Sequence, residues 1–151
     1  MTDYFAKMFA YNAAVNQQML DWLQEASGPE DKAHAIFAHL LAAERVWLLR
    51  LLGRDSSVQA VWPDLSLEDC SALIEENRDA YARYLDAAQL DSVKTVSYKN
   101  SRGNAFEMSA QDILSHVLLH SSYHRGQVTL LLRGAGAEPL NTDYLQYVRS
   151  S

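Results

Sequence analysis

Three histidines at every fourth position, His116, His120 and His124, are the residues best placed to do chemistry. In an α-helix, side chains four residues apart lie one turn apart on the same face, so two neighbouring imidazoles can bind one metal ion. The outer two histidines lie about 12 Å apart along the axis, so all three cannot share one ion. The spacing therefore predicts a metal-binding pair, with a third ligand from elsewhere in the chain.

A helical projection at about 100° per residue selects His120 and His124 as that pair. The projection predicts a buried stripe centred between these two histidines, with His116 at its edge. Arg125 falls outside the stripe, which predicts a surface residue or an ion-pair partner at an interface. The apolar positions of the predicted stripe are Ile113, Val117 and Leu131.

His39 is the candidate third ligand. It lies on an apolar face of the predicted helix at 31–52, among small side chains, whereas His34 falls on the opposite, solvent side. Glu44 falls away from His39 around this helix, so no carboxylate presents itself as a general base. Three imidazoles and a water form an open set that suits zinc, nickel or iron.

Three alternatives to a metal site stay open for the histidine pattern. The histidines could be a chance cluster on a polar face, a pH-sensitive cluster, or haem ligands. If a metal is bound, it could activate water, hold a thiolate cosubstrate or polarise a carbonyl. Cys70 and Tyr123 are expected to pack rather than react, and Asn12 and Asn16 to bond locally at the edge of an apolar stripe rather than to line a polar pocket.

Four amphipathic segments must position these residues. Apolar side chains at three- and four-residue spacing predict helices at 4–26, 31–52, 67–88 and 110–133. Ser66 and Ser109 each begin a pattern typical of a capping box, and Ser27-Gly28-Pro29 stops the first helix. Alternating β-branched residues predict a short hairpin or extended loop at 91–108, and residues 140–149 a short segment packed on the bundle. The fold class is therefore all-α, a four-helix bundle forming a single domain over residues 1–151.

Composition excludes several classes of protein. The 151 residues carry a net charge of −6, which argues against binding to nucleic-acid phosphates. No apolar run approaches the roughly 20 residues of a membrane span, and the N-terminus lacks a signal peptide. The lone Cys70 fits a reducing environment, so we expect a cytoplasmic protein. Because no membrane span is predicted, we also expect that the protein does not bind membranes.

The run from His116 to Gln127, with its Tyr-His-Arg-Gly-Gln core at 123–127, resembles the signature of the DinB family, whose members are regarded as metal-dependent enzymes. Residues 39–47 resemble the histidine segment of that family's second helix. The stretches at 98–103 and 143–145 are also similar, so the resemblance covers essentially the whole chain.

The resemblance implies an up-down-down-up bundle and a divalent-metal site at positions matching His39, His120 and His124. It also implies frequent homodimers. Relatives include transferases and isomerases that use bacillithiol, mycothiol or glutathione, and many members are known only as damage-inducible. Our first hypothesis is a metal-dependent hydrolase or thiol-dependent transferase acting on a small molecule in stress response or detoxification. The alternative is a non-catalytic, stress-induced metal- or ligand-binding dimer.

Overall fold

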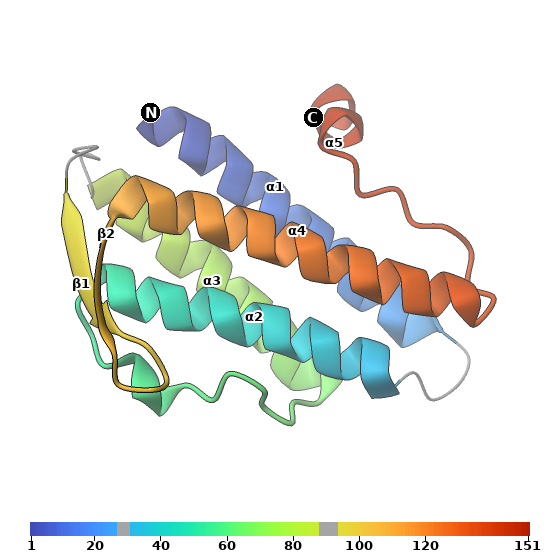
Figure 1. Cartoon of the computed structure of the whole chain (residues 1–151). Coiled ribbons are helices and arrows are strands. Elements are labelled where there is room, and N and C mark those ends of the chain that lie inside the picture. Colours follow the sequence, from blue (N-terminus) through green and yellow to red (C-terminus); the bar gives the residue numbers. More distant parts are fainter. Residues whose placement is uncertain (27–30, 88–93) are drawn as a thin grey trace.

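Four long helices form an up-down-down-up bundle in the computed structural model, which describes residues 1–26, 31–87 and 94–151. The helices are α1 (Thr2–Glu25), α2 (Asp31–Leu51), α3 (Leu67–Ala87) and α4 (Ala110–Gly134). In Figure 1, α1 and α4 run in one direction and α2 and α3 in the other. The helix α2 packs chiefly against α4, and α1 against α3. The predicted fold class is confirmed.

Local capping explains where two of the helices begin. The backbone N–H of Asp69 donates to Ser66 Oγ at 3.0 Å, and the N–H of Ser66 donates to Asp69 Oδ2 at 2.9 Å, which completes a capping box at the start of α3. Ser109 caps α4 in the same way by accepting from the N–H of Asp112 at 3.0 Å. The predicted stop at 27–29, the predicted end of the third helix at 88 and the first residues of the predicted hairpin segment, 91–93, lie outside the described residues.

The segment between α3 and α4 is a hairpin rather than an extended loop. Strands β1 (Thr95–Lys99) and β2 (Ala105–Ser109) pair antiparallel, with Tyr98 opposite Phe106. The turn between them uses Gly103 at φ +79°, a conformation that glycine adopts without strain. The hairpin lies across the ends of α2 and α4 (Figure 1), and its Val96 is buried. A short 3-10 helix, η1 (Ser56–Val58), lies in the connection after α2.

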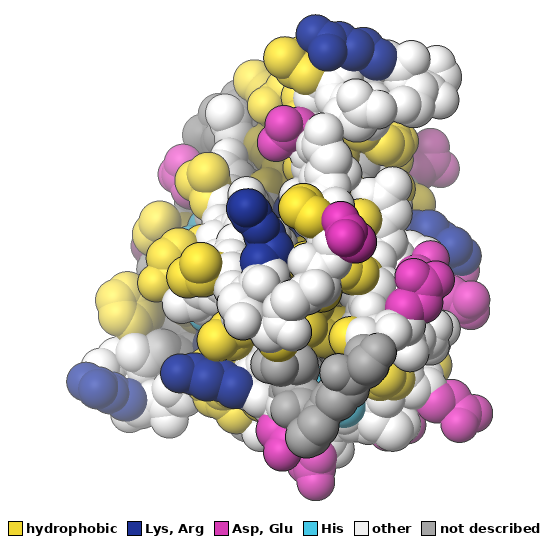
Figure 2. Space-filling model, turned by 90° about the vertical axis from the view of Figure 1, so that its right-hand side faces the viewer, with side chains coloured by type: hydrophobic (Ala, Val, Ile, Leu, Met, Phe, Trp, Pro, Cys, Tyr) yellow, Lys and Arg dark blue, Asp and Glu magenta, His cyan; other side chains and the backbone are white. Residues whose placement is uncertain are grey.

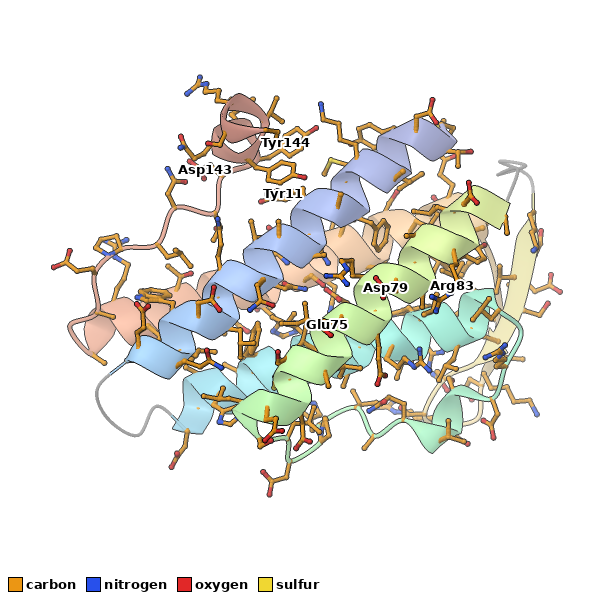
Figure 3. The ribbon with its side chains drawn as sticks, turned by 180° about the vertical axis from the view of Figure 1, so that it is seen from behind. Tyr11, Glu75, Asp79, Arg83, Asp143 and Tyr144 are labelled. Atoms are coloured by element: carbon orange, nitrogen blue, oxygen red, sulfur yellow. The ribbon has the colours of Figure 1, made fainter. Side chains whose placement is uncertain are left out.

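The C-terminal segment ends in α5 (Tyr144–Ser150), which packs on α1 through tyrosines (Figure 3). The hydroxyl of Tyr11 donates to the carbonyl of Thr142 at 2.5 Å, and the Tyr11 ring meets the edge of Tyr144 with centroids 5.2 Å apart. The predicted docking of this segment on the bundle is therefore confirmed.

The molecular surface mixes charged and apolar regions. On the face shown in Figure 2, acidic side chains gather along one edge and hydrophobic side chains along the other. Within the described residues, no helix combines the length and apolar character that a membrane span requires.

Candidate metal centre

The bundle brings together His39 of α2 and His120 and His124 of α4. One ring nitrogen from each histidine lies within 4.8 Å of the others, and the Nε2 atoms of His120 and His124 are 3.2 Å apart. Two imidazole nitrogens bound at about 2.0–2.1 Å to one tetrahedral ion lie about 3.3 Å from each other. The separation within the pair therefore fits a shared divalent ion.

Hydrogen bonds orient two of these rings. Nδ1 of His39 lies 2.7 Å from the backbone carbonyl oxygen of Val61, and Nδ1 of His124 lies 2.7 Å from Gln127 Oε1. Both oxygens can only accept, so each Nδ1 carries the hydrogen and each Nε2 keeps a lone pair. This is the arrangement that metal-binding histidines use in proteins. The i, i+3 spacing of His124 and Gln127 was the sequence signal for this contact, although the pattern alone assigned Gln127 no role.

Trp62, in the connection between η1 and α3, covers the His39 ring. The two ring centroids are 3.8 Å apart and the rings are nearly parallel, at 7°. The indole is 60% exposed, so it shields the imidazole face from water while remaining at the surface. No helical periodicity marks a loop residue, so the sequence pattern gave no sign of this contact.

The cluster favours neutral imidazoles. Burial lowers the pKa of His120 to about 4, and the neighbouring His124, His39 and His116 contribute to this lowering. Burial also lowers the pKa of His39, with a smaller opposing effect from its bond to Val61. A metal ligand must be the neutral imidazole, and the lowered pKa values of His39 and His120 favour that form of these two side chains at neutral pH.

The remaining histidines and the cysteine are not members of this cluster. His116 is exposed and packs edge-on against Trp47, with centroids 4.9 Å apart. His34, predicted to face solvent, is half-buried, and its Nε2 has no partner among the described residues. Cys70 is fully buried, and burial raises the pKa of its thiol to about 11, in keeping with a packing role.

Comparison with known proteins identifies the family. The sequence model of the DinB family matches residues 1–151. The chain belongs to the DinB family. It is 26% identical over 166 residues to the protein named Protein DinB from Bacillus subtilis (strain 168), a match that covers 98% of this chain and 95% of that relative.

The buried face of α4 in this DinB-family chain differs from the predicted one. Its centre runs along Ser121 and Val128 rather than between His120 and His124, which are only half-buried. Arg125, predicted at the surface, is 3% exposed. The projection was wrong because it treated serine and arginine as solvent-facing, whereas polar groups are buried when neighbouring helices supply partners. The buried positions are Ala110, Ile113, Leu114, Val117, Ser121, Arg125, Val128 and Leu132.

Arg125 belongs to a buried polar layer that crosses the bundle. Its Nη1 donates to Asn12 Oδ1 at 2.6 Å and to Asn16 Oδ1 at 2.8 Å. The side-chain amides of Asn12 and Asn16 donate in turn to Glu44 Oε1, at 2.7 and 3.0 Å. The two asparagines therefore bridge a buried cation and a buried carboxylate, and the prediction that they bond locally at the edge of α1 was wrong.

The polar layer is completed from α3 and α4. Ser121 Oγ donates to Glu44 Oε1 at 2.7 Å, and the Tyr81 hydroxyl donates to the backbone carbonyl of Glu44 at 2.7 Å. The Asn77 amide donates to the Leu41 carbonyl at 3.0 Å. Apolar clusters lie on both sides of this layer, one near the hairpin and one toward the opposite end of the bundle. The side chain of Glu44 therefore has a structural role in the polar layer. Its place in this layer agrees with the prediction that it falls away from His39 around α2.

Proposed function

We propose that this DinB-family protein binds one divalent metal ion through His39, His120 and His124 and uses it as an enzyme acting on a small molecule. The observation that carries the proposal is the convergence of three imidazole nitrogens, two of them with their opposite ring nitrogens already committed as donors. Zinc, nickel and iron all suit a set of three imidazoles.

When bound, such an ion supplies Lewis acidity for a hydrolysis or for a thiol transfer. The chain's own residues hold and orient the ligands. Val61 and Gln127 fix the rings of His39 and His124, and Trp62 keeps water from one face of His39. Ring fixation preserves the geometry of the donor set as substrate enters and product leaves.

The lack of a general base favours thiol transfer over hydrolysis. Within the part of the chain that the structure describes, the histidine cluster includes no carboxylate, and Glu44 is engaged by four side-chain donors in the polar layer. A thiol with a pKa near 8.5 needs much less help to ionise than a water molecule does. The proposed reaction is therefore the transfer of a low-molecular-weight thiol to an electrophile, as in cytoplasmic detoxification or stress response.

Metal analysis of single variants tests the ligand set. After reconstitution with zinc, nickel or iron and desalting, His39→Ala, His120→Ala and His124→Ala should each lose most of the bound metal. His116→Ala and His34→Ala should keep it, because these histidines lie outside the cluster. An equal loss in His116→Ala would contradict the assignment.

An activity screen separates the enzyme from the alternative, a non-catalytic metal- or ligand-binding dimer. Electrophiles are offered with glutathione, bacillithiol or mycothiol, to protein with and without restored metal. Metal-dependent loss of free thiol would support the transferase, and metal-dependent ester cleavage would support the hydrolase. Tight metal binding without turnover of any of these compounds would favour the binding protein.

We further propose that the chain forms a homodimer through the outer face of α4. Leu119, Tyr123 and Leu130 are 71%, 65% and 73% exposed and lie in one stripe of that helix. Gly126 lies in the same stripe, and no atom within 4 Å would meet a Cβ added to it. An exposed apolar stripe of this kind suits an identical helix related by a two-fold axis.

A further inference from the structure

A cavity lies beside the proposed metal centre, at the hairpin end of the bundle. It has a volume of about 770 Å³ and is lined by residues of α2, of the segment at 53–61 and of the hairpin. The three clustered histidines lie outside its lining. Val46 and Val61 line its inner side, and the carbonyl of Val61 accepts from His39, so the cavity and the cluster share a wall.

Arg50 is the best-defined charged group of this cavity. Its guanidinium carbon lies 4.4 Å from the centre of the Trp47 ring and 4.7 Å from that of the Tyr98 ring, and its Nε donates to Ser56 Oγ at 3.3 Å. Among the described residues, its terminal nitrogens donate to no protein acceptor and it makes no ion pair. Two aromatic rings thus hold a half-buried cation in place while its terminal N–H groups stay available.

The surroundings of Arg50 add positive charge. Arg54 and Lys99 also line the cavity, and Asp55 is its one acidic lining residue within the described part of the chain. The Asp55 carboxylate accepts from the backbone N–H of Ser57 at 2.9 Å, where it caps η1. The cavity therefore has an excess of cations in a chain whose net charge is −6, and a planar guanidinium matches the two oxygens of a carboxylate or phosphate.

A row of rings connects Arg50 to the histidine cluster. The ring of His116 lies 4.9 Å from Trp47 and 5.6 Å from His120, centroid to centroid. Along α2, Arg50 follows His39 by eleven residues, which corresponds to about 16 Å of helix. An extended molecule of about this length would be needed to place an anionic group at Arg50 and its opposite end at the cluster.

We propose that Arg50 binds the anionic group, a carboxylate or a phosphate, of the molecule on which the histidine cluster acts. The link to a reaction rests on the proposed function, whereas the anion site itself requires no bound metal. The substrate class is thus an anionic small molecule rather than a neutral one, and Arg50 contributes affinity rather than chemistry.

Calorimetric titration of metal-free protein tests the anion site. Succinate and inorganic phosphate are the probes, with neutral succinamide as the uncharged control. We expect the wild type to bind at least one of the two anions and not succinamide, and Arg50→Gln to bind that anion at least tenfold more weakly. The anion that binds identifies the group as a carboxylate or a phosphate.

Arg83→Gln is the matched control, because Arg83 is an exposed arginine of α3 (Figure 3) that does not line the cavity. It should bind as the wild type does. Arg54→Gln combined with Lys99→Gln removes two exposed cavity cations and should weaken binding even if Arg50→Gln folds poorly. Unchanged binding in the Arg50 and Arg54/Lys99 variants, equal loss in Arg83→Gln, or no anion binding by the wild type would overturn the proposal.

The same titration with His120→Ala separates this inference from the proposed function. Anion binding that depends on Arg50 should persist in this variant, which lacks a metal ligand. If it persists while no preparation shows turnover, the anion site stands and the enzymatic function fails. If metal-dependent turnover is found but Arg50→Gln changes neither anion binding nor KM, the function stands and the anion site fails.

Discussion

Gln127 belongs to the proposed metal centre as a residue that orients a candidate ligand and lies outside the ligand set. Its Oε1 accepts from Nδ1 of His124, and its Nε2 donates to the hydroxyl of Tyr123 at 3.3 Å. The bond to His124 selects the tautomer with a free Nε2 and sets the plane of the ring. At the scale of single residues, ligand orientation and ligand identity are separate properties.

Replacing Gln127 tests this orienting role. Gln127→Leu should weaken metal binding by about 10–100-fold, because loss of such partners has this effect in metal sites generally. Gln127→Glu should retain most of the affinity, since a carboxylate also accepts from Nδ1. Competition against a chromogenic chelator at fixed pH measures both. Gln146→Leu, which replaces an exposed glutamine of α5, is the control, and an equal loss there would show that the effect is not specific to His124.

Among the elements, α4 carries the most functions. One face of it contributes Ser121 and Arg125 to the polar layer, a second face turns His120 and His124 toward α2, and a third presents the exposed apolar stripe. Its first turn is fixed by Ser109, where β2 ends and the helix begins. The rotation of α4 about its axis sets the direction of all three faces. The residue at which the helix begins therefore affects the placement of each face.

Removal of the α4 cap measures that contribution. Ser109→Ala should lower the free energy of unfolding by about 1 kcal/mol, since the N–H of Asp112 loses its acceptor. Ser109→Thr keeps a hydroxyl and should restore most of the loss. Urea denaturation of metal-free protein provides the comparison. A stability unchanged in Ser109→Ala would show that the hairpin alone positions the helix start.

Across the whole molecule, the polar layer fixes how the four helices face one another. Arg125 and Glu44 are each 3% exposed and are connected through the two asparagines of α1. Burial lowers the pKa of the Arg125 guanidinium, and the neighbouring charge of Glu44 opposes part of that lowering. The partners of Arg125 and of Glu44 lie on helices other than their own. A rotated or shifted helix would therefore leave a buried charge without its partners.

Single and double variants test this coupling. Glu44→Leu and Arg125→Met should each destabilise the fold by about 3–5 kcal/mol, because each leaves an uncompensated buried charge. The double variant should lose less than the sum of the two, since both charges are then absent. Urea denaturation measures all three. Additive losses would show that the two charges act independently, and Asp79→Asn, which breaks only the exposed pair with Arg78, should change nothing measurable.

The proposed dimer also belongs to the scale of the molecule. Leu119→Arg combined with Leu130→Arg should convert a dimer into a monomer in analytical ultracentrifugation, because two charges would be buried at the interface. Leu145→Arg is the matched control, since Leu145 is a 62% exposed leucine on α5. A wild type that sediments as a monomer at high concentration would exclude the dimer.

The sequence by itself determined the features that depend on near neighbours. The helices, the hairpin, the capping box at Ser66 and the side-chain cap at Ser109 follow from periodicity and from contacts within a few residues, and the structure has them close to the predicted positions. The spacing of His120 and His124 belongs to the same class, because a helix sets the distance between residues four apart. His39 was predicted as the third ligand from its place on an apolar helix face, and the family resemblance implied a ligand at the same position.

Only the tertiary structure decided which polar side chains lie inside. A projection assigns Arg125, Asn12 and Asn16 from their own polarity, but their partners lie between 28 and 113 residues away in the chain. The Val61 carbonyl and the Trp62 ring reach His39 from a connection that no periodicity describes. The burial of a polar group depends on whether distant segments satisfy its hydrogen bonds, and that is settled only when the helices pack.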